Sequence, residues 1–159
     1  MIRTPCPCSG VAGRGSRPLV AAAAGLLLCA CNSSSQTVTI EDAWSPAAPP
    51  GATVAAAYMK ITAHRTDVLL SGTTPAADRV EVHATIEDDG MMRMRPLETV
   101  ALAAGETVRF APGSRHFMLT GLHESLAAGS SFPLALRFRN AGELIIDVPV
   151  RAPGDEFSH

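Results

Sequence analysis

The sequence predicts an all-β domain built as a β-sandwich. Short segments with alternating apolar residues recur at roughly ten-residue spacing, and clusters of Gly, Pro, Asn and Asp separate them. No stretch shows the apolar period of a convincing amphipathic helix. A chain of 159 residues is long enough for one domain with a buried core, and little would remain for a second.

Ten strands are expected along the domain. A loop with three prolines and a glycine, at residues 46–51, separates the first two, and Asn140-Ala141-Gly142 turns the chain between the last two, which form a hairpin that closes the sandwich. The expected strands cover residues 37–43, 54–62, 67–73, 79–85, 91–94, 98–102 and 107–110, a strand around His116, and residues 132–139 and 143–150.

Residues 1–30 have the pattern of an export signal. Three arginines and no acid precede an apolar run at residues 19–30 that is too short to span a bilayer comfortably. The run ends in Leu28-Cys29-Ala30-Cys31, which resembles a bacterial lipobox in which Cys31 is the lipidated residue. Cleavage after an alanine by the general signal peptidase, with Cys31 left as a free thiol or removed, is the alternative.

The expected domain organisation follows from this leader. After the signal at residues 1–30, residues 31–36 would form a polar tether, residues 37–151 the folded domain and residues 152–159 a flexible tail. We therefore expect the protein on the periplasmic side, lipid-anchored to a bacterial membrane.

Composition excludes two classes of function. All four cysteines lie in or at the edge of the leader, so the mature domain has no disulfide and no thiolate ligand, which rules out a blue-copper centre. The leader holds three of the 13 Lys and Arg residues and none of the 15 acids, so the mature domain carries a formal charge near −5. Nucleic acid is not an expected partner, because no basic patch remains to neutralise phosphates.

Two histidines and two methionines between residues 83 and 118 form a candidate site for a soft metal. Two imidazoles and two thioethers are a neutral donor set, and thioether sulfur selects Cu(I). His116 and Met118 are two residues apart on an expected strand and so project from one face, while Phe117 and Leu119 face the core. This pair supplies two donors side by side.

The position of the other two donors depends on one turn. His83 ends an alternating run, and we expect it on the polar face, directed outward. Asp88-Asp89-Gly90 is a turn signal: a two-residue loop would place Met94 on the same sheet face as His83, and a three-residue loop would place it on the other. Met91 is expected to face away from Met94, and Met92 is a reserve donor.

The spacing of the four residues, H-x10-M-x21-H-x-M, resembles the pattern of periplasmic copper chaperones of the PCuAC type. Two positions depart from that family. Ala84 stands where some members carry an extra methionine, which concerns only an optional fifth donor, and Ser45-Pro46 follows Trp44 where a basic residue is expected. The resemblance covers the whole mature domain through residues 55–59, 75–81, 94–96, 142–143 and 148–150.

The resemblance implies a cupredoxin-like Greek-key β-sandwich and a chaperone that is not an enzyme. It implies one Cu(I) held by His83, Met94, His116 and Met118 and delivered to the CuA centre of cytochrome c oxidase. The partner would be subunit II of that oxidase or another assembly chaperone. A secondary site for Cu(II), at His123 or His159, is left open because imidazole also suits the oxidised ion.

Two other function classes remain open at this stage. A copper redox enzyme, an oxidase or a dismutase-like protein, would need stable Cu(II) with an open coordination position. A metal-free β-sandwich interaction module would take up no metal. Ser125 beside His123 and Glu124 does not indicate a hydrolase, because three neighbours on one loop cannot adopt the geometry of a triad.

Overall fold

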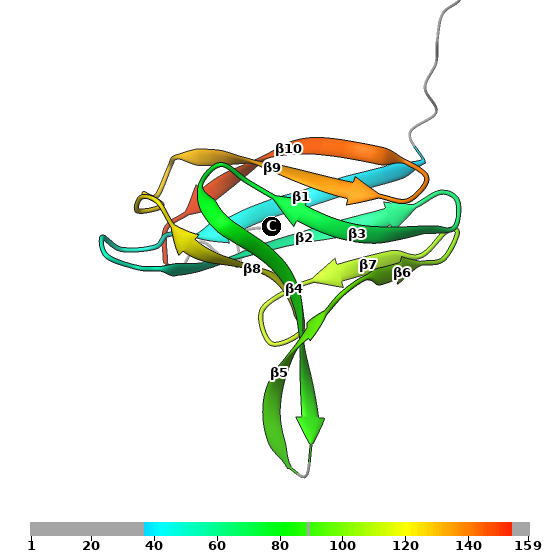
Figure 1. Ribbon diagram of the computed structural model, residues 1–159, viewed down its shortest axis with the longest axis horizontal. Helices are drawn as coiled ribbons and strands as arrows, with labels where there is room; N and C mark the ends of the chain where they lie inside the picture. The colour runs from blue at the N-terminus through cyan, green and yellow to red at the C-terminus, as the bar shows by residue number, and fades with distance from the viewer. Residues whose placement is uncertain (1–36, 89, 154–159) are drawn as a thin grey trace, which may run out of the picture. The chain divides into compact units, whose positions relative to one another are not determined.

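The computed structural model describes residues 37–88 and 90–153, which form ten β-strands without any helix (Figure 1). The prediction of an all-β fold is confirmed. Within these residues there is also no helix that could cross a membrane. The leader and tether expected at residues 1–36, and the end of the expected tail from residue 154, lie outside the described residues.

Each expected strand has an observed counterpart. Two have the expected bounds, β3 and β7, and the largest extensions are at β1, β4 and β5. The strands are β1 (Val38–Pro46), β2 (Val54–Ala63), β3 (Asp67–Thr73), β4 (Ala77–Asp88), β5 (Met91–Leu97), β6 (Val100–Leu102), β7 (Thr107–Phe110), β8 (Arg115–Leu122), β9 (Ser131–Phe138) and β10 (Gly142–Arg151).

The strands form a barrel-like sheet. Their order is β5-β4-β8-β7-β2-β1-β10-β9-β3-β6. In addition, β8 pairs with β2, and β3 pairs with β4, which closes the sheet into a ring. Most pairs are antiparallel, whereas β1 with β10 and β7 with β8 are parallel. β5 lies at one edge of the sheet, and the β4–β5 hairpin projects away from the other strands (Figure 1).

The ring closes where β3 meets β4 at one residue pair, Gly72 with Val80. A Cβ atom at Gly72 would lie 3.0 Å from Cγ1 of Val80, which is closer than side chains normally approach. A glycine therefore permits the close contact between these two strands.

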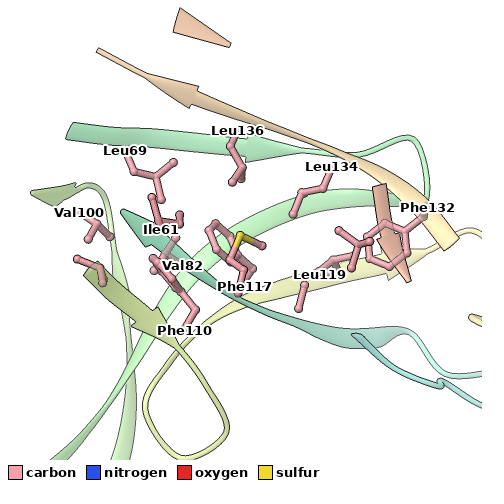
Figure 2. Packing of buried hydrophobic residues seen from close by; sticks show 14 of the residues in the cluster. Ile61, Leu69, Val82, Val100, Phe110, Phe117, Leu119, Phe132, Leu134 and Leu136 are labelled. Carbon is pink, nitrogen blue, oxygen red and sulfur yellow. The ribbon is translucent and has the colours of Figure 1, made fainter. Parts of the chain in front are cut away.

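One apolar core fills the ring (Figure 2). On β8, Phe117 and Leu119 are fully buried, as the sequence predicted, and the Phe117 ring stacks on Phe110 with 4.6 Å between centroids. Val82 is buried and Val80 packs against the core. Burial of each large side chain contributes about 2 kcal/mol. Other fully buried members are Ile61, Leu69, Leu102, Leu134, Leu136 and Val148.

One carboxylate, that of Asp67, is buried together with its hydrogen-bond donors. Asp67 at the start of β3 accepts hydrogen bonds from the backbone N–H groups of Val68 at 2.7 Å and of Asn140 and Ala141 at 2.9 Å. Burial by itself would raise the pKa of Asp67, but these backbone donors outweigh it and the pKa is lowered. The charged side chain thus fixes the β9–β10 turn to the first residue of β3.

The first strand extends beyond its expected end at residue 43. Ser45 and Pro46 pair in parallel with Val150 and Arg151 of β10, and Pro46 is the last residue of the strand. Ser45 is fully buried, so a basic side chain there would have to bury its charge. The cation beside Trp44 comes instead from Arg151, whose guanidinium lies 5.3 Å from the ring centroid.

Candidate metal centre

The pairing of β4 with β8 places two histidines directly opposite each other. His83 faces His116 across the antiparallel ladder, and opposite residues in such a ladder project from one sheet face. Their rings are 6.0 Å apart between centroids, with 39° between ring planes. Met118, two residues beyond His116, shares this face and lies opposite Glu81.

The hairpin turn brings Met94 to the same face. β4 ends at Asp88 and β5 begins at Met91, so two residues connect the paired strands. Gly90, with φ +76°, has the left-handed conformation that tight hairpin turns require. Met94 therefore pairs with Thr85, which is two residues from His83 and on its face. This is the shorter of the two loops that the turn signal allowed.

The four side chains differ widely in burial. His116 is 8% exposed, the His83 side chain is 14% exposed, and Met118 is half-buried, whereas Met94 is 64% exposed. His83 lies on the sheet face opposite the buried Val82, as expected, but the expectation that it is exposed there is wrong, because the ring of His116 lies beside it. All four residues lie within strands, His83 in β4, Met94 in β5, and His116 and Met118 in β8.

Three of the four residues line one open groove with a volume of about 510 Å³. Its walls come from β2, β4, β5, β8 and the loop after β7, and they contain no Asp, Glu, Lys or Arg. His83 is not among the lining residues and stands beside the groove, against His116. The lining residues are Val54, Ala55, Ala56, Tyr58, Thr85, Met92, Met94, Pro112, Gly113, His116 and Met118.

Each of the paired histidines keeps one ring nitrogen available. Nε2 of His83 lies 3.4 Å from the Glu81 carboxylate, so Nε2–H is the donor and Nδ1 carries the lone pair. That Nδ1 is buried and has no hydrogen-bond partner among the described residues. In His116, Nδ1 lies 3.3 Å from the carbonyl oxygen of Ser114, which leaves the lone pair on Nε2.

This donor set fits a soft cation. An orphaned buried nitrogen costs about 1–3 kcal/mol, and a metal bound to Nδ1 of His83 would remove that cost. Glu81 would act as the outer partner that orients a ligating imidazole. In the described part of the chain, no three His, Cys, Asp or Glu residues cluster to hold a metal. The thioethers of Met94 and Met118, which line the groove together with His116, are the soft donors nearest to a metal at the histidine pair.

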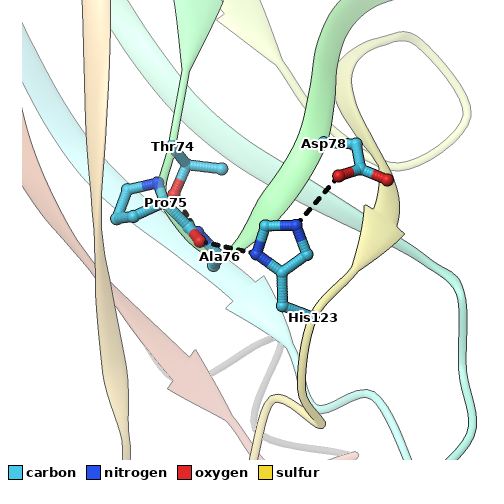
Figure 3. Close-up of polar contacts among 5 residues, drawn as sticks. All are labelled: Thr74, Pro75, Ala76, Asp78 and His123. Carbon is cyan, nitrogen blue, oxygen red and sulfur yellow. Dashed lines mark hydrogen bonds and ion pairs between the residues drawn. The ribbon is translucent and has the colours of Figure 1, made fainter.

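His123, which the sequence left open as a Cu(II) ligand, is held by other groups (Figure 3). Nδ1 lies 2.9 Å from the carbonyl oxygen of Pro75, and Nε2 lies 2.9 Å from the Asp78 carboxylate. Both partners accept hydrogen bonds, so both nitrogens donate. The bond to Asp78, followed by the bond to Pro75, raises the pKa of His123.

An imidazole protonated on both nitrogens has no lone pair for a metal. His123 instead joins the end of β8 to the start of β4, through Asp78, and to the loop before β4, through Pro75. The sequence gave no signal for this contact, because Asp78 and His123 are 45 residues apart. His159 lies outside the described residues.

Comparison of the sequence identifies a lipoprotein family and two relatives. A family model described as "Putative lipoprotein LpqE-like" matches residues 38–150. "Putative lipoprotein Lxx21020" from Leifsonia xyli subsp. xyli is 33% identical over 115 residues, covering 72% of this chain and 69% of that protein. "Uncharacterized protein RP573" from Rickettsia prowazekii is 36% identical over 72 residues, covering 45% of this chain and 40% of that protein.

Comparison of the structure identifies similar solved domains. The copper-bound PCuAC domain from PmoF2 matches with a TM-score of 0.62 and 28% identity, covering 74% of this chain and 94% of that one. The apo PmoF2 domain matches with a TM-score of 0.64 and 27% identity, covering 77% and 95%. Apo-DR1885 from Deinococcus radiodurans, at 23% identity, TM-score 0.59 and coverage of 93% and 99%, shows likeness of fold alone.

The His123 contacts predict a titration that can be measured by NMR. The pKa of His123 should lie above its ordinary value of 6.5, and Asp78→Asn should lower it, because the carboxylate that favours the imidazolium is removed. Since the folded pKa is raised, the contact stabilises the fold fully below the unfolded pKa, and this stabilisation is lost as pH rises through the folded pKa.

Asp147→Asn, at an exposed residue of β10, is the matched control and should leave the His123 titration unchanged. Equal His123 titration curves for the parent and Asp78→Asn would contradict the assigned ion pair.

Proposed function

Since the chain belongs to the LpqE-like lipoprotein family, we propose that it is a copper chaperone that binds one Cu(I). Its predicted resemblance to the PCuAC type is confirmed, and its fold is shared with a copper-bound PCuAC domain. The proposed ligands are His83, Met94, His116 and Met118. The observation that carries the proposal is the register that sets His83 opposite His116, with a free lone pair assigned to each.

The donor chemistry favours Cu(I) over harder ions. Two thioethers and two neutral imidazoles carry no charge, so the set suits a soft monovalent cation better than Mg²⁺ or Ca²⁺. The groove in which Met94, His116 and Met118 meet has no charged residue in its lining. A site without an anionic ligand leaves the charge of the ion uncompensated, and it should release copper to a thiolate-bearing acceptor more readily than a cysteine site would.

Exposure of the site supports exchange rather than catalysis. Met94 is largely open to solvent at the rim of the groove, so an acceptor can reach one ligand while the buried histidine still holds the ion. We propose the CuA centre of cytochrome c oxidase as the destination, reached through subunit II or another assembly chaperone. A cupredoxin-like Greek-key β-sandwich remains the proposed fold description, with the barrel-like all-β sheet as its support.

The proposed location is the periplasmic side of a bacterial membrane, with a lipid anchor at Cys31. The match to a lipoprotein family and the printed name of the Leifsonia relative support this location. A signal at residues 1–30 would then be removed, residues 31–36 would form the tether, and residues 37–151 would form the copper-binding domain in the periplasm.

Replacing the two thioethers together should remove most of the Cu(I) affinity. Met94→Leu with Met118→Leu keeps the apolar volume and deletes both sulfur donors, so the fold should persist while copper binding weakens. Competition against a chromogenic Cu(I) chelator measures the change. Met59→Leu is the control, because Met59 is buried in the core and is not a proposed ligand. A double variant that competes as well as the parent would refute the ligand set.

Cys31→Ser should abolish anchoring. If Cys31 is the lipidated residue, the variant should move from the membrane fraction to the soluble fraction or remain unprocessed, and it should incorporate no labelled fatty acid. Cys29→Ser, two residues earlier in the leader, is the control that should keep the label. Fatty-acid labelling of the Cys31→Ser product would contradict the anchor assignment.

Deleting the gene in its host should lower cytochrome oxidase activity when copper is scarce. Added copper should largely restore the activity, because a carrier raises the rate of delivery without supplying chemistry that the oxidase lacks. The parent chain should complement the deletion, and the Met94→Leu/Met118→Leu chain should not. Complementation by the double variant at low copper would argue against delivery and favour an interaction module.

The double methionine variant is preferred here to replacing all four ligands by alanine. His116 lies on the face opposite Phe117 and Leu119 but is buried there, so its truncation to alanine would leave a cavity that destabilises the fold.

A further inference from the structure

Three methionines lie close together on β5, and the hairpin register sorts them onto two faces. Met92 pairs with Glu87 and Met94 pairs with Thr85, so both project from the face that carries His83. Met91 is an odd number of residues from Met94 and projects from the opposite face. Of the other two methionines on β5, only Met92 therefore projects from the face of the proposed copper site.

Met92 continues the proposed site toward the end of the hairpin. Met92 and Met94 are 65% and 64% exposed, and both line the groove that also contains His116 and Met118. Met91 is 55% exposed but is absent from that lining. Residues i and i+2 of a strand are about 7 Å apart, a separation that two long, flexible methionine side chains can bridge.

The three methionines that line the groove differ in exposure to solvent. Met118 is half-buried next to the buried His116, whereas Met94 and Met92 follow one another outward along a hairpin that projects from the other strands (Figure 1). An acceptor protein has no direct access to the covered His83, but it can approach the exposed thioethers. The route between the histidines and an acceptor therefore passes the exposed part of β5.

We propose that Met92 is an auxiliary Cu(I) donor, which the ion contacts as it enters and leaves the four-residue site. This proposal rests on the proposed function and adds the exchange route to it. Met92 is not a fifth resident ligand: it binds copper while another bond to the ion is being broken.

The exchange step conserves charge and protons. A bond forms between the Met92 sulfur and Cu(I), and the bond from one resident donor then breaks, which returns that donor to its free form. Copper stays in the +1 state, and no proton moves because a thioether carries none. The sulfur of Met92 provides the same soft donor chemistry as Met94, so transfer between them requires no change of ligand type.

Met92→Leu and Met91→Leu form a matched pair of variants for the test. Both replace an exposed methionine on β5 by an apolar residue of similar volume, and they differ in the face from which the side chain projects. Each Cu(I)-loaded protein is mixed with excess chromogenic chelator, and the rate of copper loss is followed by stopped-flow absorbance. Equilibrium competition against the same chelator gives the affinity.

The expected result is that Met92→Leu slows copper loss several-fold and leaves the equilibrium affinity within experimental error of the parent. Met91→Leu should match the parent in both measurements. Uptake from a Cu(I)–chelator complex should be slowed by the same factor as loss, because an unchanged equilibrium constant requires both rates to change together.

Parental exchange rates in Met92→Leu, or equal slowing in both variants, would overturn the proposal. A fall in affinity for Met92→Leu alone would make Met92 a resident ligand and would also overturn it. A parent protein that takes up no Cu(I) would refute the proposed function and this route together. Tight binding by the parent with unchanged exchange in Met92→Leu would refute the route alone.

Discussion

The candidate site depends on the register of β4 with its two neighbours. β4 pairs with β8 on one side and with β5 on the other, and these two registers decide which side chains share a face with His83. Side chains alternate along a strand, so a slip of one residue in either pair would move a proposed donor to the opposite face. The two-residue connection between Asp88 and Met91 sets the register of β4 with β5.

The same alternation joins the site to the core. Phe117 and Leu119 are fully buried inside the ring, and His116 and Met118, which alternate with them on β8, project from the other face. Packing of the two apolar residues therefore fixes the strand that carries two proposed ligands. Donors on paired strands are positioned more firmly than donors on loops, which suits a site that must bind the ion before it meets an acceptor.

Two histidines in the structure differ in how their ring nitrogens are used. His123 donates from both ring nitrogens, to Asp78 and to Pro75, and its pKa is raised as a result. His83 has one long hydrogen bond, to Glu81, and a buried nitrogen without a hydrogen-bond partner among the described residues. The first arrangement stabilises a cation on the protein, whereas the second retains a lone pair that a bound cation can use.

The sequence by itself determined the all-β class, the approximate position of all ten strands and the shared face of His116 and Met118, because these follow from local alternation and turn chemistry. The types of donor were also evident, since they depend only on residue identity. The tertiary structure decided how these parts meet. It selected the shorter hairpin loop, placed His83 beside His116, extended β1 through its pairing with β10, and brought His123 to Asp78. Each of these depends on contacts between residues far apart in the chain or on a turn with two permitted lengths, and local sequence does not distinguish between such alternatives.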